Sequence, residues 1–202
     1  LQYTNNILLF AKNELGWTPY NPNRKFFQYY QKEFLMCTAK FKVGRFSRRL
    51  GKTEILVIKA IHFIYTSLEK NPTVLIFVPF DNLAIEIFNR INSLMTGKTS
   101  KLNQSKIGGF KSPFYQVSYY REDIEAEAYI RIFTTGAKSG GGAVSARGQK
   151  GHFIFGDEEG YFHPNDYSAI LPLLEENPHV EFWGFSTPNA VPNAFKDKCM
   201  KD

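Results

Sequence analysis

The apolar and polar residues along this chain fall into the two periods that are typical of strands and helices. Thr73–Val78 (TVLIFV) is a continuous apolar run, as in a parallel strand buried on both faces of its sheet. Thr53–Leu68 is apolar nearly all round, which predicts a helix enclosed in a core. In Leu83–Met95 the apolar residues recur at helical spacing, and Asp81 is a suitable N-cap for that helix.

The same periods predict further elements toward both ends of the chain. We expect more helices at Asn5–Leu15, Lys25–Met36 and Asn165–Glu176, and more strands at Phe41–Phe46, Phe114–Tyr120, Tyr129–Thr134, Phe153–Gly156 and Val180–Phe185. Of these strands, Phe41–Phe46 is expected to be buried, and Phe114–Tyr120 and Tyr129–Thr134 can pair as an insertion hairpin. The glycine-containing stretches Gly97–Lys111 and Gly136–Gly148 are expected to be loops. Strands that alternate with helices predict an α/β fold, with a mostly parallel central sheet and helices on both faces. At 202 residues, the whole chain (1–202) fits one domain.

Composition narrows the class of protein. The longest apolar stretch, Ile55–Leu68, is interrupted by Lys59 and His62 and is too short to cross a bilayer, so no membrane partner is expected. Cys37 and Cys199 form no CxxC pair, which argues against a disulfide framework or a zinc site and favours a reducing compartment. The net charge of +6 suits a polyanionic partner, but a charge this small also fits solubility alone.

The most informative loop follows the expected strand Phe41–Phe46. It consists of Ser47, Arg48, Arg49, Leu50, Gly51, Lys52 and Thr53. Gly-Lys-Thr between a strand and a helix is the core of a phosphate-binding loop, in which the Lys reaches the β and γ phosphates of ATP and the Thr hydroxyl ligates Mg²⁺. The full pattern GxxxxGK[ST] fails at its first position, where Phe46 replaces Gly, so a solvated turn is the alternative for the tripeptide alone. Arg48 and Arg49 favour the phosphate site, because guanidinium groups there would neutralise phosphate charge.

A second candidate half of the site is the acidic run after the expected strand Phe153–Gly156. Carboxylates at the C-terminal end of a parallel strand lie where open α/β sheets bind ligands. We expect Asp157 to hold Mg²⁺, directly or through water, and Glu158 to polarise the attacking water. Glu159 is expected to be a supporting or surface group. The alternative is that these three acidic residues only begin a helix or form a surface turn, and the apolar run directly before Asp157 argues against it.

Two further loop segments are candidates for the same site. Arg147 ends the glycine-rich stretch ten residues before Asp157; a lone loop arginine is usually solvated, but near a nucleotide it is a candidate arginine finger. Ser186, Thr187 and Pro188 follow the expected strand Val180–Phe185. A simple strand-ending turn explains them by themselves, and their hydroxyl groups can also sense a γ-phosphate.

In this order, the motifs resemble the ATPase domain of the large terminase subunit, the DNA-packaging motor of tailed bacteriophages. That family has a variant Walker A loop, S-R-x-x-G-K-T, which Ser47–Thr53 matches, so the missing first Gly is no longer an objection. Its Arg-Gly pair, Walker B Asp-Glu, coupling motif S/T-T-P and downstream Phe are matched by Arg147-Gly148, Asp157-Glu158, Ser186-Thr187-Pro188 and Phe195. The resemblance covers residues 41–195.

The resemblance implies a RecA-like P-loop (ASCE) ATPase that uses ATP and Mg²⁺ to drive double-stranded DNA into a procapsid. It implies a homo-oligomeric ring in the host cytoplasm, with the portal and the small terminase as partners. Arg48 matches an arginine that acts within its own subunit, and Arg147 matches one that reaches a neighbour's ATP. The family's adenine-side Gln is not matched in Pro22–Lys25, and the nearby Gln28 and Gln31 leave that assignment open.

The resemblance and the motifs also argue against three other activities: DNA cleavage, two-domain helicase activity and nucleotide binding without hydrolysis. Only 14 residues (189–202) follow Pro188, so we expect the family's C-terminal nuclease domain, and with it DNA cleavage, to be absent. A two-domain helicase or other nucleic-acid translocase is the first alternative, but those usually carry His or Asp two residues after the Asp-Glu pair, where this chain has Gly160. A non-hydrolysing nucleotide switch is the second, and the presence of both Lys52 and Glu158 argues against it.

Overall fold

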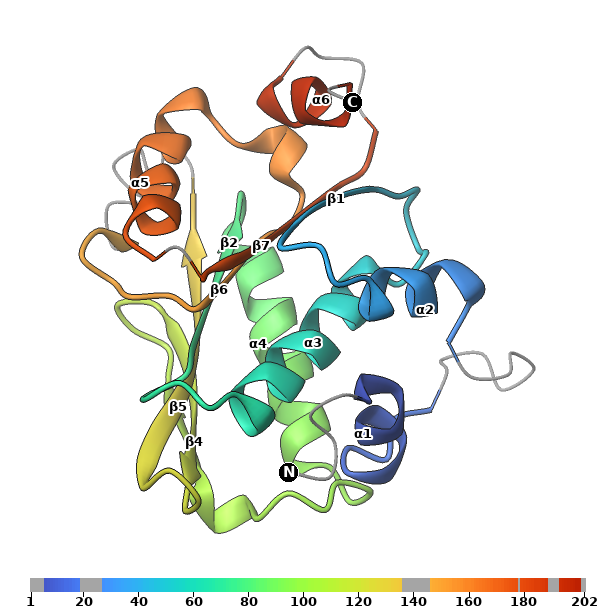
Figure 1. Cartoon of the computed structure of the whole chain (residues 1–202), viewed down its shortest axis with the longest axis vertical. Helices are drawn as coiled ribbons and strands as arrows, with labels where there is room; N and C mark the ends of the chain where they lie inside the picture. Colours follow the sequence, from blue (N-terminus) through green and yellow to red (C-terminus); the bar gives the residue numbers. More distant parts are fainter. Residues whose placement is uncertain (1–5, 19–26, 136–145, 178, 189–192, 201–202) are drawn as a thin grey trace.

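The computed structural model of the chain describes residues 6–18, 27–135, 146–177, 179–188 and 193–200. Within these residues the strands form one seven-stranded sheet in the order β1-β7-β6-β2-β5-β4-β3 (Figure 1). The strands are β1 (Phe41–Arg45), β2 (Thr73–Val78), β3 (Ile107–Phe110), β4 (Tyr115–Arg121), β5 (Ala126–Thr134), β6 (Phe153–Gly156) and β7 (Glu181–Ser186). β1, β7, β6, β2 and β5 are parallel, and β4 and β3 continue the sheet antiparallel. The predicted α/β fold with a mostly parallel sheet is confirmed.

Helices cover both faces of this sheet (Figure 1). They are α1 (Ile7–Asn13), α2 (Tyr29–Met36), α3 (Lys52–Thr66), α4 (Asp81–Thr96), α5 (Pro164–Glu175) and α6 (Ala194–Cys199), with short 3₁₀ helices η1 (Gln104–Lys106) and η4 (Glu159–Tyr161). α3 and α4 pack on one face, α1 and α2 contact α3 from outside, and α5 lies on the other face (Figure 1). None of the helices in the described part of the chain is long and apolar enough to span a bilayer.

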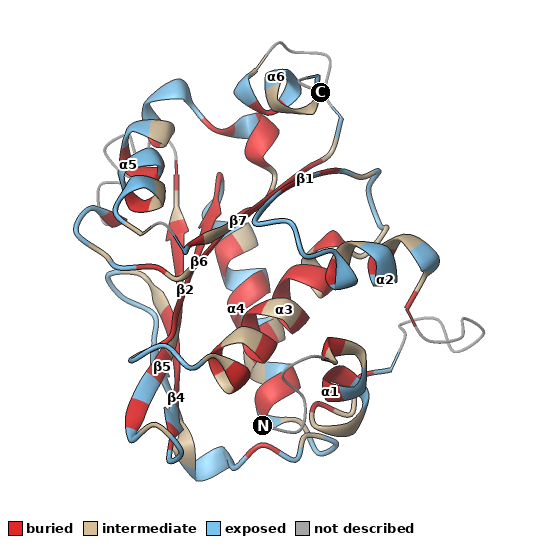
Figure 2. Ribbon diagram, viewed as in Figure 1, coloured by how far each residue is buried: buried red, intermediate tan, exposed pale blue. Residues whose placement is uncertain are grey.

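The central strand β2 shows why its sequence is apolar throughout. Successive side chains of a strand point to opposite faces of the sheet. Val74, Ile76 and Val78 face the larger core, beneath α3 and α4, whereas Leu75 and Phe77 face the smaller core, beneath α5. Every residue of β2 is buried, as the red ribbon at the centre of Figure 2 shows. A strand between two layers of helices therefore needs no polar face.

Three local predictions need correction. β1 is an edge strand, so Phe41 and Val43 are exposed and only alternate residues of the strand are buried. The N-cap of α4 is Phe80, and Asp81 is the first residue of the helix. β3 lies inside the predicted loop Gly97–Lys111, because pairing with β4 overrides the weak strand propensity of its two glycines.

The predicted strands Phe114–Tyr120 and Tyr129–Thr134 do form a hairpin, as β4 and β5. β5 also pairs in parallel with β2, so the hairpin extends the main sheet instead of forming a separate insertion. Most of the predicted loop Gly136–Gly148 lies outside the described residues.

The register of the parallel strands brings the candidate motifs to one edge of the sheet. Arg45, at the end of β1, lies beside Ser186 of β7, and Gly156, at the end of β6, lies beside Gly184. The loops that follow these strands therefore emerge together at the C-terminal edge, which is where open α/β sheets bind ligands.

Candidate active site

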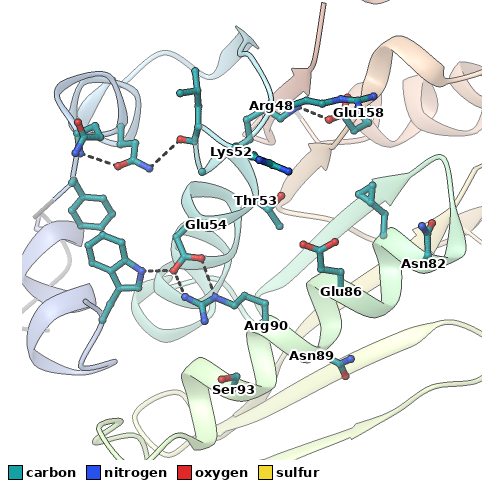
Figure 3. A pocket seen from close by; sticks show the side chains of 18 of the residues that line it. Arg48, Lys52, Thr53, Glu54, Asn82, Glu86, Asn89, Arg90, Ser93 and Glu158 are labelled. Atoms are coloured by element: carbon teal, nitrogen blue, oxygen red, sulfur yellow. Dashed lines mark hydrogen bonds and ion pairs between the residues drawn. The ribbon is translucent and has the colours of Figure 1, made fainter. Parts of the chain in front are cut away.

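A cavity of about 1490 Å³ opens where these strands end. One wall comes from the segment before α2 and from α2, the floor from the loop between β1 and α3, and the opposite wall from α4 (Figure 3). Its lining includes Arg48, Arg49, Leu50, Gly51, Lys52, Thr53 and Glu158. The two motifs thus border one space, although they lie far apart in the sequence.

The loop before α3 has the backbone geometry of an anion cradle. Gly51 is the N-cap of α3 and has φ +77°, a left-handed conformation that glycine adopts without strain. A side chain at this position would also come within 2.6 Å of Gln31 Nε2. The first N–H groups of a helix have no partner within the helix, so the start of α3 presents donors and a positive dipole end to the cavity. The Tyr30 hydroxyl donates to the Leu50 carbonyl at 2.7 Å, which ties the loop to α2.

Lys52, Glu158 and Thr187 form a closed triangle of polar contacts. Lys52 Nζ lies 2.5 Å from Glu158 Oε1 and 2.7 Å from Thr187 Oγ1. The Thr187 hydroxyl donates to Glu158 Oε1 at 2.8 Å, and the Thr187 N–H donates to Glu158 Oε2 at 3.0 Å. Burial raises the pKa of Glu158, but the hydrogen bonds from Lys52 and Thr187 outweigh it and leave the pKa below its usual value. Glu158 is therefore ionised at neutral pH.

The backbone at Glu158 is also unusual. Its φ of +52° places a non-glycine residue in the left-handed region. Such conformations are costly and persist where the surrounding structure holds them, commonly at functional sites. The three contacts of the carboxylate with Lys52 and Thr187 are part of what holds it here.

Thr53 and Asp157 are neighbours at the base of the triangle. Thr53 Oγ1 lies 3.4 Å from Asp157 Oδ2, and the Glu158 N–H donates to Asp157 Oδ1 at 3.0 Å. Asp157 is only 1% exposed, and burial raises its pKa to about 6. A hydroxyl and a carboxylate are oxygen ligands of the kind that Mg²⁺ takes when it keeps waters and phosphate oxygens as its other ligands, so these two residues fit such an ion.

The predicted coupling residues Ser186, Thr187 and Pro188 link Glu158 to η4, the short helix that follows it in the chain. Ser186 is buried at the end of β7, and its Oγ accepts the Gly160 N–H at 3.0 Å. Thr187 contacts both Lys52 and Glu158, as described above. Pro188 comes directly after it. The segment thus contacts η4 with one side chain and the carboxylate with the next.

The other predicted site residues lie farther out. Arg48 and Arg49 are exposed and border the cavity, whereas Ser47 is exposed and does not line it. Arg147 is exposed and also lies outside the cavity; its neighbour Ala146 belongs to the smaller core beside α5. The structure therefore does not bring Arg147 to the cavity that Arg48–Thr53 line in its own chain.

Solved structures resemble the whole of this fold. The large terminase ATPase domain of Thermus phage P74-26 matches with a TM-score of 0.66 and 21% identity, over 91% of this chain and 70% of that domain. The large terminase of bacteriophage HK97 matches with a TM-score of 0.66 and 12% identity, over 93% of this chain and 38% of that protein. The large terminase of a thermophilic bacteriophage, solved in complex with ADP, matches with a TM-score of 0.54 and 10% identity, over 91% of this chain and 39% of that protein.

The chain has the fold of a large-terminase ATPase domain. The match agrees with the predicted α/β fold, in which helices cover both faces of a mostly parallel sheet. No protein-family model and no curated protein matches the sequence. The chain spans less than two fifths of the HK97 terminase and of the terminase solved with ADP.

Glu159 is expected from the sequence to be a supporting or a surface group, and within this terminase ATPase fold the surface position is wrong. Its side chain is fully buried, and it points away from the cavity, where it accepts a hydrogen bond from Tyr167 of α5 at 2.7 Å and pairs with Lys198 of α6. A side chain at Gly184 would come within 2.1 Å of Glu159 Oε2. Glu158 and Glu159 therefore face opposite ways, and Glu159 anchors the turn rather than lying at the surface.

Sequence reasoning also missed a polar cluster in the cavity wall. Glu54 of α3 pairs with Arg90 of α4 and accepts a hydrogen bond from the Trp17 indole N–H. The available signal was an acidic residue directly after Thr53, at the start of an otherwise apolar helix. Its partners come from two other elements, so no local pattern could have named them.

Proposed function

We propose that this chain is the ATP-hydrolysing motor domain of a viral large terminase, which uses Mg²⁺ and ATP to translocate double-stranded DNA. The observation that supports the proposal most strongly is the triangle of contacts among Lys52, Glu158 and Thr187 at the N-terminus of α3. The triangle brings together a cation suited to phosphate, an ionised carboxylate and a hydroxyl. It lies at the C-terminal edge of the sheet, where open α/β folds bind ligands. The ADP complex of the thermophilic phage's terminase supports a nucleotide as the ligand.

In this proposal the chain's own groups divide the work of hydrolysis. The N–H groups at the start of α3 and the Lys52 ammonium bind the β and γ phosphates. Phosphate oxygens compete with Glu158 for Lys52, and this frees the carboxylate to polarise the attacking water. Thr53 and Asp157 would hold the Mg²⁺, which would neutralise charge on the phosphates. Thr187 keeps Glu158 oriented while Lys52 changes partner.

The two predicted arginines take different places in the proposal. Arg48 borders the cavity and acts within its own subunit, where it neutralises charge on the transferred phosphoryl group. Arg147 is exposed and lies away from its own cavity, so it acts on the ATP of a neighbour in a homo-oligomeric ring. Ser186, Thr187 and Pro188 transmit the state of the site to the segment after β7.

The biological setting of the proposal comes from the resemblance to terminases. In it, residues 1–202 act as one ATPase domain. The ring works in the host cytoplasm and binds the procapsid transiently, with the portal and the small terminase as partners. The net charge of +6 is compatible with a DNA partner.

Phosphate release from ATP, measured with Mg²⁺ and with or without double-stranded DNA, tests this function. We expect turnover that DNA stimulates. Lys52→Ala removes the charge that binds the β and γ phosphates and should lower turnover on the order of 10²-fold or more. Lys32→Ala, which removes an exposed lysine from α2, is the matched control and should leave turnover unchanged. Turnover of Lys52→Ala within about twofold of wild type would exclude the phosphate-loop assignment. ATP binding without hydrolysis would support a nucleotide switch instead.

A further inference from the structure

The part of the cavity farther along α3 from Lys52 is built around one ion pair (Figure 3). Arg90 donates from Nε to Glu54 Oε2 at 2.9 Å and from Nη2 to Glu54 Oε1 at 2.5 Å. This two-point pairing fixes the plane of the guanidinium as well as its position. Arg90 lines the cavity from α4, and its side chain is 40% exposed, so part of the cation faces the open space.

Glu54 is itself held in place from a third element. The Trp17 indole N–H donates to Glu54 Oε1. The Trp17 ring stacks on Phe27 with 4.1 Å between centroids and 10° between planes, and both rings are buried. The ion pair is therefore supported from the segment after α1, from α3 and from α4. Groups held by three elements are preorganised, which lowers the entropy lost when a ligand binds.

Most of the hydrogen-bonding groups that Glu54 and Arg90 leave unused are N–H donors of Arg90. A carboxylate has about four acceptor positions, and Glu54 uses three of them on Arg90 and Trp17. A guanidinium has five N–H groups, and Arg90 directs two of them to Glu54. None of the described residues offers Arg90 a second acceptor. The ligand that fits this wall carries acceptor atoms and a flat face, on which a guanidinium can also stack.

The position of the pair relative to the phosphate loop indicates which part of a nucleotide it can meet. Glu54 is two residues after Lys52 in the first turn of α3, roughly 3 Å farther along the helix axis. A nucleotide whose phosphates lie at the start of α3 must place its sugar and base in the rest of the cavity, which Glu54 and Arg90 also line. The cavity of about 1490 Å³ leaves room for them beside Arg90.

We propose that Arg90 is a specificity-determining residue that binds the nucleoside part of ATP, with Glu54 and Trp17 as the positioning residues that hold it. This inference rests on the proposed function, because it assumes that ATP binds at Lys52. The ring nitrogens of adenine supply the acceptors, and the ring supplies the flat face. The alternative is that the ion pair only joins α3 to α4, in which case it contributes to stability and not to the recognition of the nucleoside.

Binding of two ligands with the same charged end separates these possibilities. Isothermal titration calorimetry with Mg²⁺ compares AMP-PNP, a non-hydrolysable ATP analogue, with inorganic tripolyphosphate, which has no nucleoside. We expect Arg90→Ala to raise the Kd for AMP-PNP about tenfold or more and to leave the Kd for tripolyphosphate within about twofold. Lys98→Ala, which removes an exposed charge just beyond the end of α4, is the control and should change neither Kd.

Each remaining outcome has a definite reading. An equal loss for both ligands, or no loss for either, would overturn the role of Arg90 while leaving the proposed function intact. Wild-type protein that binds neither ligand would overturn the proposed function, and this inference with it. If Arg90→Ala does not fold, Arg90→Lys replaces it: the lysine keeps the charge beside Glu54 but loses the planar fork. The inference then requires a selective loss of AMP-PNP affinity in that variant, and equal affinities would overturn it.

Discussion

The Lys52 ammonium and the Glu158 carboxylate, 106 residues apart in sequence, lie 2.5 Å from each other at the end of the parallel sheet. The side chains of Lys52 and Glu158 are 8% and 18% exposed, so the pair is largely screened from water. A charge pair in such a place responds strongly to a third charge, because the surrounding dielectric is low. A phosphate group that binds Lys52 would therefore change the environment of the proposed catalytic base directly.

Glu158→Gln should keep ATP binding and stop hydrolysis. The amide preserves the size of the side chain but cannot take a proton from water, so turnover should fall on the order of 10²–10⁴-fold. Binding of a fluorescent ATP analogue and phosphate release, measured on the same preparation, check both halves of this expectation. Glu33→Gln, at an exposed position of α2, is the control. Normal hydrolysis by Glu158→Gln would mean that another group is the base.

Thr187→Val should lower kcat and leave KM nearly unchanged. The valine has the same shape but loses the hydroxyl that accepts from Lys52 at 2.7 Å and donates to Glu158 at 2.8 Å. A hydrogen bond to a charged group contributes about 1.5–3 kcal/mol, so kcat should fall roughly 10–100-fold. Thr187→Ser retains the hydroxyl and should restore most of the activity. If valine and serine variants are equally active, Thr187 does not orient the carboxylate.

The raised pKa of Asp157 predicts a dependence of stability on pH. Burial moves this pKa from 3.8 to about 6, so the folded state binds a proton more tightly than the unfolded chain does. The free energy of unfolding should therefore fall as the pH rises from about 4 to about 6, and this contribution should level off above that. Asp157→Asn has no such charge to bury and should be more stable than wild type at pH 8, by about 3 kcal/mol. Urea unfolding at pH 4 and pH 8 measures this; an unchanged difference between the two proteins would contradict it.

The local sequence was enough to predict the two segments, around Lys52 and Glu158, that border the cavity. Glu158 follows the apolar strand β6, Lys52 begins the helix that follows β1, and parallel strands bring their C-terminal ends to one edge. Sequence could not predict that Glu54 pairs with Arg90, because that contact depends on how α3 packs against α4. It also could not tell which way Glu159 faces, since the direction is set by the left-handed backbone of the residue before it and by partners on α5 and α6. Nor could the sequence predict that β1 lies at the edge of the sheet, because this depends on the order of the strands.

Subunits with different defects can show which arginine acts on a neighbour's ATP. Arg147 is exposed and outside its own cavity, so in the proposed ring it should complete the site of the next subunit. Arg147→Ala and Glu158→Gln subunits should each be inactive by themselves. In mixed rings, some interfaces combine an intact Glu158 with an intact Arg147 from the neighbour, and partial ATP turnover should return.

The matched mixture combines Arg48→Ala with Lys52→Ala. Both residues border the cavity of the same chain, so neither subunit can supply what the other lacks, and no turnover should return. Sedimentation must show that both mixtures assemble, because the argument requires shared interfaces. Assembly of the first mixture without any recovery would exclude Arg147 as the residue that acts between subunits. Recovery in the second mixture would instead mean that Arg48 reaches across the interface, which would reverse the roles assigned to the two arginines.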